Sequence, residues 1–462
     1  MLSRFVLGLL LISFSFVGST YGDYVTMVDN GPSANRVDVV FLGDGYTASQ
    51  LNTTYVMHID RMLDHMFDDA EDPFPRYEQF FNVHRVNVES NESGADVPPD
   101  GVFRDTALDA SYYFDGATDR LLYIDSAKAD AQIRTNIGRA FQVDMRLVTV
   151  NDPRYGGGGG SYAVYSGGNF SAPEVALHEL GHSFAGLADE YGGDPGVYPG
   201  GEPFEPNLTK DANGEKWSQW LGYEEPGMGT IGAYEGGGYY DEGIYRPSEN
   251  SKMRTLNNKF DAVSREEIIL DIYDLVNPLD AWLANSATVN NPTSLWVDAI
   301  DPEVIDVRWL VNGIEVLGAT GETFNPRAFG LLAGDYEITA FAEDLTPWVR
   351  IEREKLQQSV SWNVHLDLLE PLLGDANGDG VVDLTDLNLV RNHFGQVGVL
   401  IPGDTFPFDG VVDLADMNAV RNNFSLLGGI LVPEPSSYQL AAVLVCALTC
   451  GLRAMTRGER KR

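Results

Sequence analysis

The residues most able to act together chemically are His178, Glu179 and His182, in the sequence HELGH. Residues four apart on an α-helix lie on one face about one turn apart, so both imidazoles can reach a single metal ion. Zinc favours imidazole nitrogen, and a glutamate beside the two histidines can take a proton from a zinc-bound water. The spacing therefore predicts a Zn²⁺ site with His178 and His182 as ligands and Glu179 as the general base.

The residues before this motif favour the helix that the geometry needs. Residues 172–174, Ala-Pro-Glu, suit a first helical turn because proline is tolerated there. Residues 175–177 continue with an apolar lead-in. The other histidines stand in helical or strand patterns without such neighbours, and we predict structural roles for them: His58, His65, His84, His365 and His393.

A third zinc ligand is expected shortly after the second histidine. In the metzincin pattern, a glycine follows that histidine by three residues and the third ligand follows the glycine by three more. Here the glycine is Gly186, one residue late, and Asp189 stands three residues beyond it. We therefore predict Asp189 as the oxygen ligand, with Glu190 as the alternative. The Gly- and Pro-rich stretch that follows offers no obvious ligand glutamate on a later helix.

The composition describes a folded and strongly acidic chain. It has 462 residues, of which 44% are hydrophobic and 11% aromatic, enough for about two to four domains. A net charge of −37 arises from 31 basic and 68 acidic residues. That charge repels phosphate backbones and anionic membrane surfaces, so nucleic acid is not an expected partner. The only cysteines are Cys446 and Cys450, so the body of the chain lacks disulfides.

Between residues 23 and 284, strands and helices are expected to alternate, which predicts an α/β domain with a mixed central sheet. The expected strands are Val37–Leu42, Phe81–Val88, Leu121–Ile124 and Leu147–Val150. The expected helices, besides the one carrying HELGH, are Leu51–Met66, Ala129–Phe141 and Ser264–Leu275. Ser264 and Glu267 are expected to form a capping box. The glycine run 156–160 and the Gly-, Pro- and Tyr-rich residues 191–245 are expected to be loops.

Residues 285–370 change to short alternating strands, which predict an all-β, Ig-like sandwich. The clearest runs are Leu295–Val297, Val307–Val311 and Tyr336–Thr339. Turn sequences separate them, such as Asn312-Gly313.

Residues 371–428 contain a duplication in which an acidic loop precedes a helix each time. The first loop matches a Ca²⁺-binding loop, with oxygen ligands at positions 1, 3, 5, 7, 9 and 12: Asp375, Asn377, Asp379, Val381 (through its carbonyl), Asp383 and Asp386. The second loop has Thr405 and Pro407 where positions 1 and 3 are expected, so its metal binding is left open. The pair resembles dockerin type I repeats. That resemblance implies a small α-helical calcium module and a cohesin-like partner.

The two ends of the chain carry signals of export. Arg4 precedes an apolar run and small residues, which predicts a secretory signal peptide over residues 1–22. Residues 429–462 contain Val-Pro-Glu-Pro, a short apolar stretch and a basic cluster, and they resemble a PEP-CTERM sorting tail. This resemblance implies transient membrane anchoring and a cell-surface or extracellular location.

Several stretches resemble the bacterial IgA-peptidase family of metallopeptidases, which is metzincin-like. They are HELGHSFAGLADEY, VVFLGDGYTASQL, PFPRYEQFFNVHRVNVESNESGADVP and YGGGGGSYAVYS, and the similarity spans about residues 36–275. The resemblance implies a zinc metallopeptidase domain over residues 23–284 that cleaves protein or peptide substrates. It also implies that Met253 packs beneath the zinc site. Cleavage of immunoglobulin does not follow from it.

We therefore expect a secreted or cell-surface zinc endopeptidase. The alternative is a surface binding or scaffold protein that no longer turns over substrate and attaches through its sandwich and dockerin-like modules. The intact Glu179 favours the enzyme, because this residue serves catalysis and is not needed to hold the metal.

Overall fold

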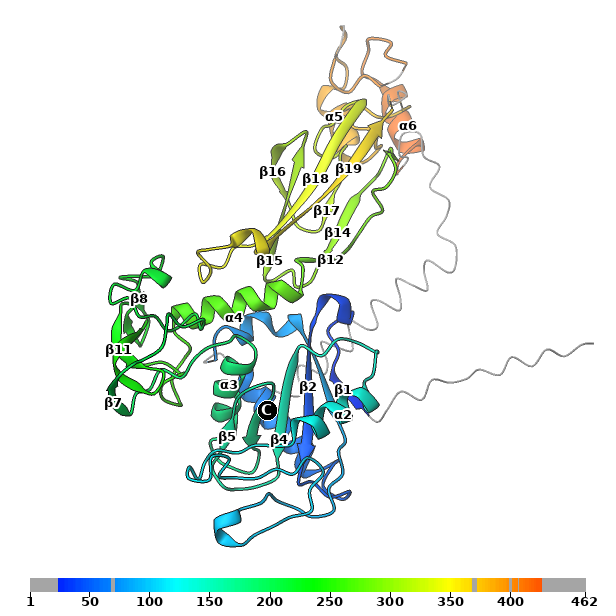
Figure 1. Cartoon of the computed structure of the whole chain (residues 1–462). Coiled ribbons are helices and arrows are strands. Elements are labelled where there is room, and N and C mark those ends of the chain that lie inside the picture. The colour runs from blue at the N-terminus through cyan, green and yellow to red at the C-terminus, as the bar shows by residue number, and fades with distance from the viewer. Residues whose placement is uncertain (1–23, 68–70, 368–371, 399–400, 406, 426–462) are drawn as a thin grey trace, which may run out of the picture. The chain divides into compact units, whose positions relative to one another are not determined.

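The computed structural model describes residues 24–67, 71–367, 372–398, 401–405 and 407–425 (Figure 1). The predicted signal peptide, residues 1–22, and the predicted sorting tail, residues 429–462, lie outside the described residues. Among the described residues, no helix combines the length and the apolar character needed to cross a bilayer.

Contacts divide the chain into two compact units. The first runs to residue 281 and also takes in residues 298–306 and 342–358. The second comprises residues 282–297 and 307–341 and the chain from residue 359 onward. The boundary expected at residues 284 and 285 stays a prediction, and the contacts add two later segments to the first unit.

Helices and strands alternate in the first unit, as expected. Its helices are α1 (Thr54–Met66), α2 (Ser126–Asn136), α3 (Ala172–Ser183) and α4 (Ala262–Leu275). Its main sheet is formed by β1 (Tyr24–Val28), β2 (Val37–Asp44), β3 (Phe81–Val86), β4 (Met145–Val150), β5 (Gly157–Gly158) and β6 (Ala163–Ser166). Further short strands are β7 (Asp194–Val197), β8 (Glu224–Glu225), β9 (Gly229–Thr230), β10 (Tyr234–Gly237) and β11 (Tyr240–Arg246).

The main sheet is mixed, which confirms the predicted α/β class. Its strand order is β1-β3-β2-β4-β6-β5. The inner pairs β2–β3, β2–β4 and β4–β6 are parallel, whereas β1 and β5 run antiparallel at the two edges. All residues of β2 and β3 are buried, as expected when helices cover both faces of a parallel sheet.

Helices cover both faces of this sheet. Successive strand residues point to opposite faces, and Val40, Leu42, Val148 and Val150 share a buried cluster with Ala129 of α2. The other face is covered by α1 and α3, which contact each other and the strands β4 and β6 (Figure 1). The helix that carries HELGH therefore lies against the sheet and next to its β5 edge.

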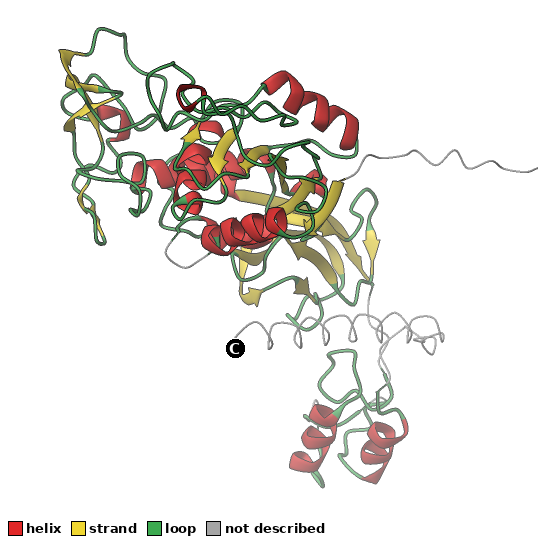
Figure 2. Ribbon diagram, turned by 90° about the horizontal axis from the view of Figure 1, so that it is seen from below, coloured by secondary structure: helices red, strands yellow, loops and turns green. Residues whose placement is uncertain are grey.

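Four local expectations differ from the structure. Residues 121–124 form isolated bridges rather than a strand, and Gly157–Gly158 in the glycine run form the edge strand β5. Residues 191–245 contain short strands between loops (Figure 2). The N-cap of α4 is Asp261, whose carboxylate accepts the Ser264 N–H, so no capping box begins at Ser264. A buried aspartate was available one turn earlier, and it accepts the Ser264 N–H that the Glu267 side chain was expected to bind.

The chain after α4 contains the expected short strands. They form two sheets, with the orders β12-β14-β17 and β13-β19-β18-β15-β16. Their strands are β12 (Leu279–Trp282), β13 (Val289–Asn290), β14 (Leu295–Ala299), β15 (Ile305–Val311), β16 (Ile314–Thr320), β17 (Thr323–Phe324), β18 (Gly334–Asp344) and β19 (Gln357–Leu366). Trp309 of β15 stacks on Phe324 of β17, with ring centroids 5.3 Å apart. This contact joins the two sheets face to face.

The duplicated segments each form one helix, α5 (Leu384–His393) and α6 (Leu414–Asn422), and the two helices pack together. Each begins with an aspartate capping box. In the first loop Asp375 accepts the Gly380 N–H at 2.9 Å, and in the second loop Asp404 accepts the Gly410 N–H at 2.9 Å. The counterpart of Asp375 is therefore Asp404 rather than Thr405, because the second loop is one residue longer.

Candidate metal centre

The metal motif lies on α3, as the sequence predicted. Pro173 stands in the first turn of this helix, where its missing N–H costs no hydrogen bond. His178 and His182 project from the same face one turn apart, with ring centroids 4.8 Å apart at 88°. Both side chains are only partly buried and line a cleft of about 880 Å³.

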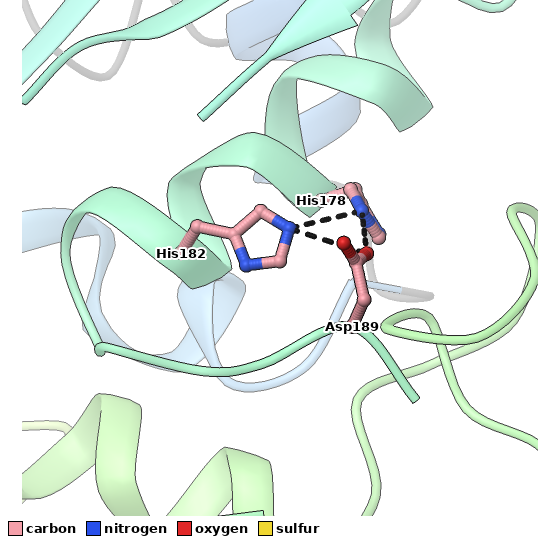
Figure 3. A group of neighbouring side chains, drawn as sticks. All are labelled: His178, His182 and Asp189. Atoms are coloured by element: carbon pink, nitrogen blue, oxygen red, sulfur yellow. Dashed lines mark hydrogen bonds and ion pairs between the residues drawn. The ribbon is translucent and has the colours of Figure 1, made fainter. Parts of the chain in front are cut away.

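Three donor atoms meet at one point (Figure 3). The Nε2 atoms of His178 and His182 are 3.2 Å apart, and Asp189 Oδ1 lies 3.0 Å from the first and 3.4 Å from the second. In a tetrahedral zinc site with bonds of about 2.0–2.1 Å, neighbouring ligand atoms are separated by about 3.3 Å. The donor set and its spacing therefore fit a zinc ion.

Hydrogen bonds fix which nitrogen of each histidine is free. His178 Nδ1 is 3.0 Å from the Lys252 carbonyl, and His182 Nδ1 is 2.6 Å from the Leu187 carbonyl. A carbonyl only accepts, so each Nδ1 carries the hydrogen and each Nε2 presents its lone pair. Two lone pairs and a carboxylate oxygen then face one another, an arrangement that suits a cation.

The local electrostatics agree with that reading. Burial lowers the pKa of His182, but the hydrogen bond and charge of Asp189 outweigh burial and raise it to about 9. Burial raises the pKa of Asp189, yet contacts with His178 and His182 hold it far below its usual range. The raised pKa of His182 and the lowered pKa of Asp189 both favour positive charge next to this carboxylate.

Asp189 reaches the site because the chain turns sharply after α3. Gly186 has a φ of 58°, the left-handed conformation that ends many helices and that glycine adopts at little cost. The Leu187 N–H then donates to the Gly181 carbonyl at 2.9 Å. Asp189 Oδ1 is buried and has no hydrogen-bond partner among the described residues, so it is available as a ligand.

Two tyrosines hold the other oxygen of Asp189. The Tyr191 hydroxyl donates to Oδ2 at 3.0 Å, and the Tyr239 hydroxyl donates to the same atom at 2.5 Å. Their rings also contact each other edge to face. Hydrogen bonds of this kind orient a ligand carboxylate and tune its affinity for metal. Sequence reasoning missed both tyrosines, since Tyr239 lies far along the chain in a stretch expected to be loop.

Glu190, the alternative ligand, points away from the metal centre. Its carboxylate is fully buried and accepts hydrogen bonds from Ser251 Oγ at 2.6 Å and Asn207 Nδ2 at 3.0 Å. Burial, reinforced by the charge of Asp261, raises its pKa to about 8. Its N–H donates to the Met253 carbonyl. Glu190 thus ties the chain after α3 to the Met253 loop.

Met253 packs directly against α3. Its side chain is fully buried, and its sulfur would lie 2.7 Å from a Cβ built on Gly181, between the two histidines in sequence. Only glycine leaves room for that sulfur. The neighbouring Lys252 supplies the carbonyl bonded to His178, so this loop supports the histidines from behind.

Glu179 is almost fully buried beside the histidines, and burial raises its pKa above the usual value. A Cβ on Gly157 would lie 2.8 Å from its Oε1, and one on Gly159 would lie 3.0 Å from its Oε2. The glycine run therefore passes closely over this carboxylate. Its glycines allow a close approach that any side chain would block.

A second cluster lies behind the metal centre. His65 Nε2 is 3.1 Å from Glu71 Oε1 and 3.0 Å from Glu174 Oε1. Lys252 Nζ, which is fully buried, is 3.0 Å from Glu71 Oε2 and 2.7 Å from Glu174 Oε2. Each carboxylate thus bridges a histidine and a lysine. The ammonium group already fills the centre of this cluster, so we assign it to structure rather than to metal binding.

The predicted calcium ligands follow a different pattern. Asp386 accepts backbone N–H groups from Ala376, Asn377 and Asp383, and Asp375 accepts them from Gly378 and Gly380. Among the described residues, the carboxylates of this loop are not gathered as tightly as the two clusters above. Calcium binding therefore stays a prediction.

Comparisons with known proteins place this geometry in context. The family model described as IgA Peptidase M64 matches residues 25–230 and 223–272, together more than half of the chain. The matched residues include the histidine pair, Glu179, Asp189 and the Met253 loop. The search of curated proteins returned no match.

Proposed function

Because the chain belongs to the IgA peptidase M64 family, we propose that it is a zinc-dependent endopeptidase that works outside the cytoplasmic membrane. Membership implies hydrolysis of peptide bonds, a metal ion and protein or peptide substrates. Zinc, the residue roles and the location are our proposals. The single observation that carries the zinc site and its residue roles is the convergence of His178, His182 and Asp189 on one point.

We assign the zinc ion to His178 Nε2, His182 Nε2 and Asp189 Oδ1. When bound, zinc supplies a Lewis acid that makes a water molecule acidic and polarises the substrate carbonyl. Other residues of the chain orient the three ligand side chains. The carbonyls of Lys252 and Leu187 accept the Nδ1 hydrogens, so each neutral ring turns Nε2 toward the metal position, and Tyr191 and Tyr239 hold the Asp189 carboxylate in place.

Glu179 is proposed to act as the general base and then as the acid. Its buried carboxylate has a raised pKa, so it binds a proton more readily than an exposed glutamate does. It can accept a proton at a carboxylate oxygen and return it to the leaving amine. The glycines over this side chain let the backbone pack closely against its carboxylate, which adds to its burial.

The cleft supports a polymeric substrate. It is open, and its walls come from residues 120–124, the glycine run and the tyrosine-rich chain after α3. Export through residues 1–22, anchoring through residues 429–462 and Ca²⁺ binding by the first acidic loop are further proposals that rest on sequence alone. A cohesin-like partner is proposed on the same basis.

The decisive experiment compares wild type with Glu179→Gln and Glu179→Ala, measuring zinc content and casein digestion together. We expect one zinc per chain in all three proteins and loss of digestion in both variants, because Glu179 is not a ligand. Undiminished digestion by the variants would exclude this mechanism. Zinc-loaded wild type that cleaves no protein or peptide would instead favour the surface-binding alternative.

A further inference from the structure

Two arginines in the cleft have no acidic partner. Arg120 and Arg254 line the same cavity as the metal ligands, and both are exposed. Among the described residues, none of the ion pairs involves either of them. The chain carries a net charge of −37, so carboxylates are plentiful. Two arginines without an ion-pair partner, in the cavity that the metal ligands also line, indicate a ligand that brings its own negative charge.

The chain holds Arg120 at the β5 wall of the cleft. The Gly157 N–H donates to the Arg120 carbonyl at 3.1 Å, and the Leu122 N–H donates to the Gly157 carbonyl at 3.1 Å. Residues 120–122 therefore cover the outer edge of β5 at Gly157, and a substrate strand cannot pair there. Arg120 lines the same cavity as Glu179.

Arg254 stands on a different wall, in the loop that packs under α3. Its N–H donates to the Ser251 carbonyl at 3.1 Å, which fixes the backbone next to Met253. One guanidinium nitrogen donates to the Glu249 carbonyl at 2.6 Å. A guanidinium has five N–H donors in a planar fork, so donors remain for a carboxylate.

We propose that Arg120 and Arg254 select substrates that carry an acidic side chain near the scissile bond. The proposal deepens the peptidase assignment and rests on it. A guanidinium binds a carboxylate through two parallel hydrogen bonds, and a partly enclosed cleft strengthens them. The acidic surface elsewhere repels such a peptide. The two arginines oppose that repulsion within the cavity that the metal ligands line.

The test uses two peptide pools that differ only in carrying Glu or Gln at fixed positions on either side of the bond. The proteins are zinc-loaded wild type, Arg120→Gln, Arg254→Gln and the control Arg139→Gln, which changes an exposed arginine outside the cleft. We expect wild type to favour the Glu pool. Each cleft variant should lose about 10- to 100-fold in kcat/KM on the Glu pool. On the Gln pool it should change by less than about 3-fold, and the control should match wild type.

A binding arm separates this proposal from the peptidase assignment. Glu179→Gln protein, with and without Arg120→Gln, is titrated with both labelled pools and followed by fluorescence anisotropy. Preference for the Glu pool that disappears with Arg120→Gln supports the proposal, even if wild type cleaves neither pool and the peptidase assignment fails. Any of three results overturns the proposal. They are equal binding of the two pools, an equal loss of kcat/KM on both pools in a cleft variant, and cleavage of both pools by wild type at the same kcat/KM.

Discussion

Lys252 Nζ lies 2.7 Å from Glu174 Oε2, in a position where the lysine is fully buried. Glu174 stands one turn before His178 on α3, and the Lys252 carbonyl accepts the Nδ1 hydrogen of His178. This ion pair therefore joins the helix that carries the metal motif to the loop that supports it. Its strength bears on both stability and metal geometry.

Removing the Lys252 charge should destabilise the first unit strongly. In Lys252→Met, Glu71 and Glu174 remain buried and close together, and only His65 is left as a cationic partner. Breaking a buried pair in this way costs about 3–5 kcal/mol. Thermal unfolding of zinc-loaded protein should show a clearly lower midpoint. The matched control is Lys259→Met, whose ion pair with Asp72 is partly exposed and should contribute about 0–1 kcal/mol. Similar losses in the two variants would contradict a special role for the buried cluster.

Asp189 and Glu190 should behave differently although they are neighbours. Asp189→Asn removes the only carboxylate of the donor triangle, so zinc should be lost under mild chelation together with activity. Glu190→Gln keeps the shape of a fully buried side chain that contacts Ser251 and Asn207, so zinc should be retained. Metal analysis after dialysis against a weak chelator gives the answer. Retention in Asp189→Asn and loss in Glu190→Gln would move the ligand by one residue.

Tyr239→Phe should weaken metal binding without removing a ligand. The substitution leaves Asp189 Oδ2 with only the Tyr191 hydroxyl as donor. Losing such a supporting hydrogen bond typically lowers metal affinity by about 10- to 100-fold. Competition with a chromogenic chelator measures the zinc dissociation constant. Tyr240→Phe, which alters a tyrosine that packs on Tyr198, is the control and should stay near wild type. An unchanged zinc dissociation constant in Tyr239→Phe would show that the Tyr191 hydroxyl alone is enough to orient the Asp189 carboxylate.

The cluster behind the metal centre predicts a loss of stability at alkaline pH. Hydrogen bonds to Glu174 and Glu71 raise the pKa of His65 to about 9 from its ordinary value of 6.5. Between these two pKa values the folded state holds a proton that the unfolded state releases. The stability that protonated His65 contributes is therefore complete below pH 6.5 and is lost as pH rises through about 9. Unfolding midpoints measured across this range should fall more steeply for wild type than for His65→Gln. Parallel curves would contradict the prediction.

Calcium should bind the first acidic loop. Asp375, Asp379, Asp383 and Asp386 repel one another without a cation, so Ca²⁺ should stabilise the loop and the helix after it. Calorimetric titration of the whole zinc-loaded chain should show at least one site. Asp375→Asn should abolish or weaken that site, whereas Asp335→Asn, in the second unit outside the loop, should not. A titration without binding heat in wild type would refute the assignment.

Local spacing predicted the histidine pair and Asp189 as candidates because all three lie within one helix and the turn that follows it. The mixed sheet was also predictable, since buried parallel strands read as apolar runs. Tyr239 and Lys252 were not, because they reach the site through contacts between residues far apart in the chain. The edge strand at Gly157 was missed for another reason. A glycine run carries no strand pattern, and its pairing depends on the neighbouring chain.

The first unit is built from three separate segments of the chain, so it can finish folding only after the last of them has been synthesised. Asp344 belongs to its last segment, and its carboxylate accepts the hydroxyls of Tyr77 and Tyr273 and pairs with Arg76. A nascent chain is made from its N-terminus onward. The side chains of these three donors therefore have no Asp344 carboxylate to bind until more than two thirds of the chain has been synthesised. Maturation of the hydrolytic unit is therefore a late event in biosynthesis. A chain truncated before residue 342 would leave two buried tyrosines unsatisfied and vulnerable to quality control.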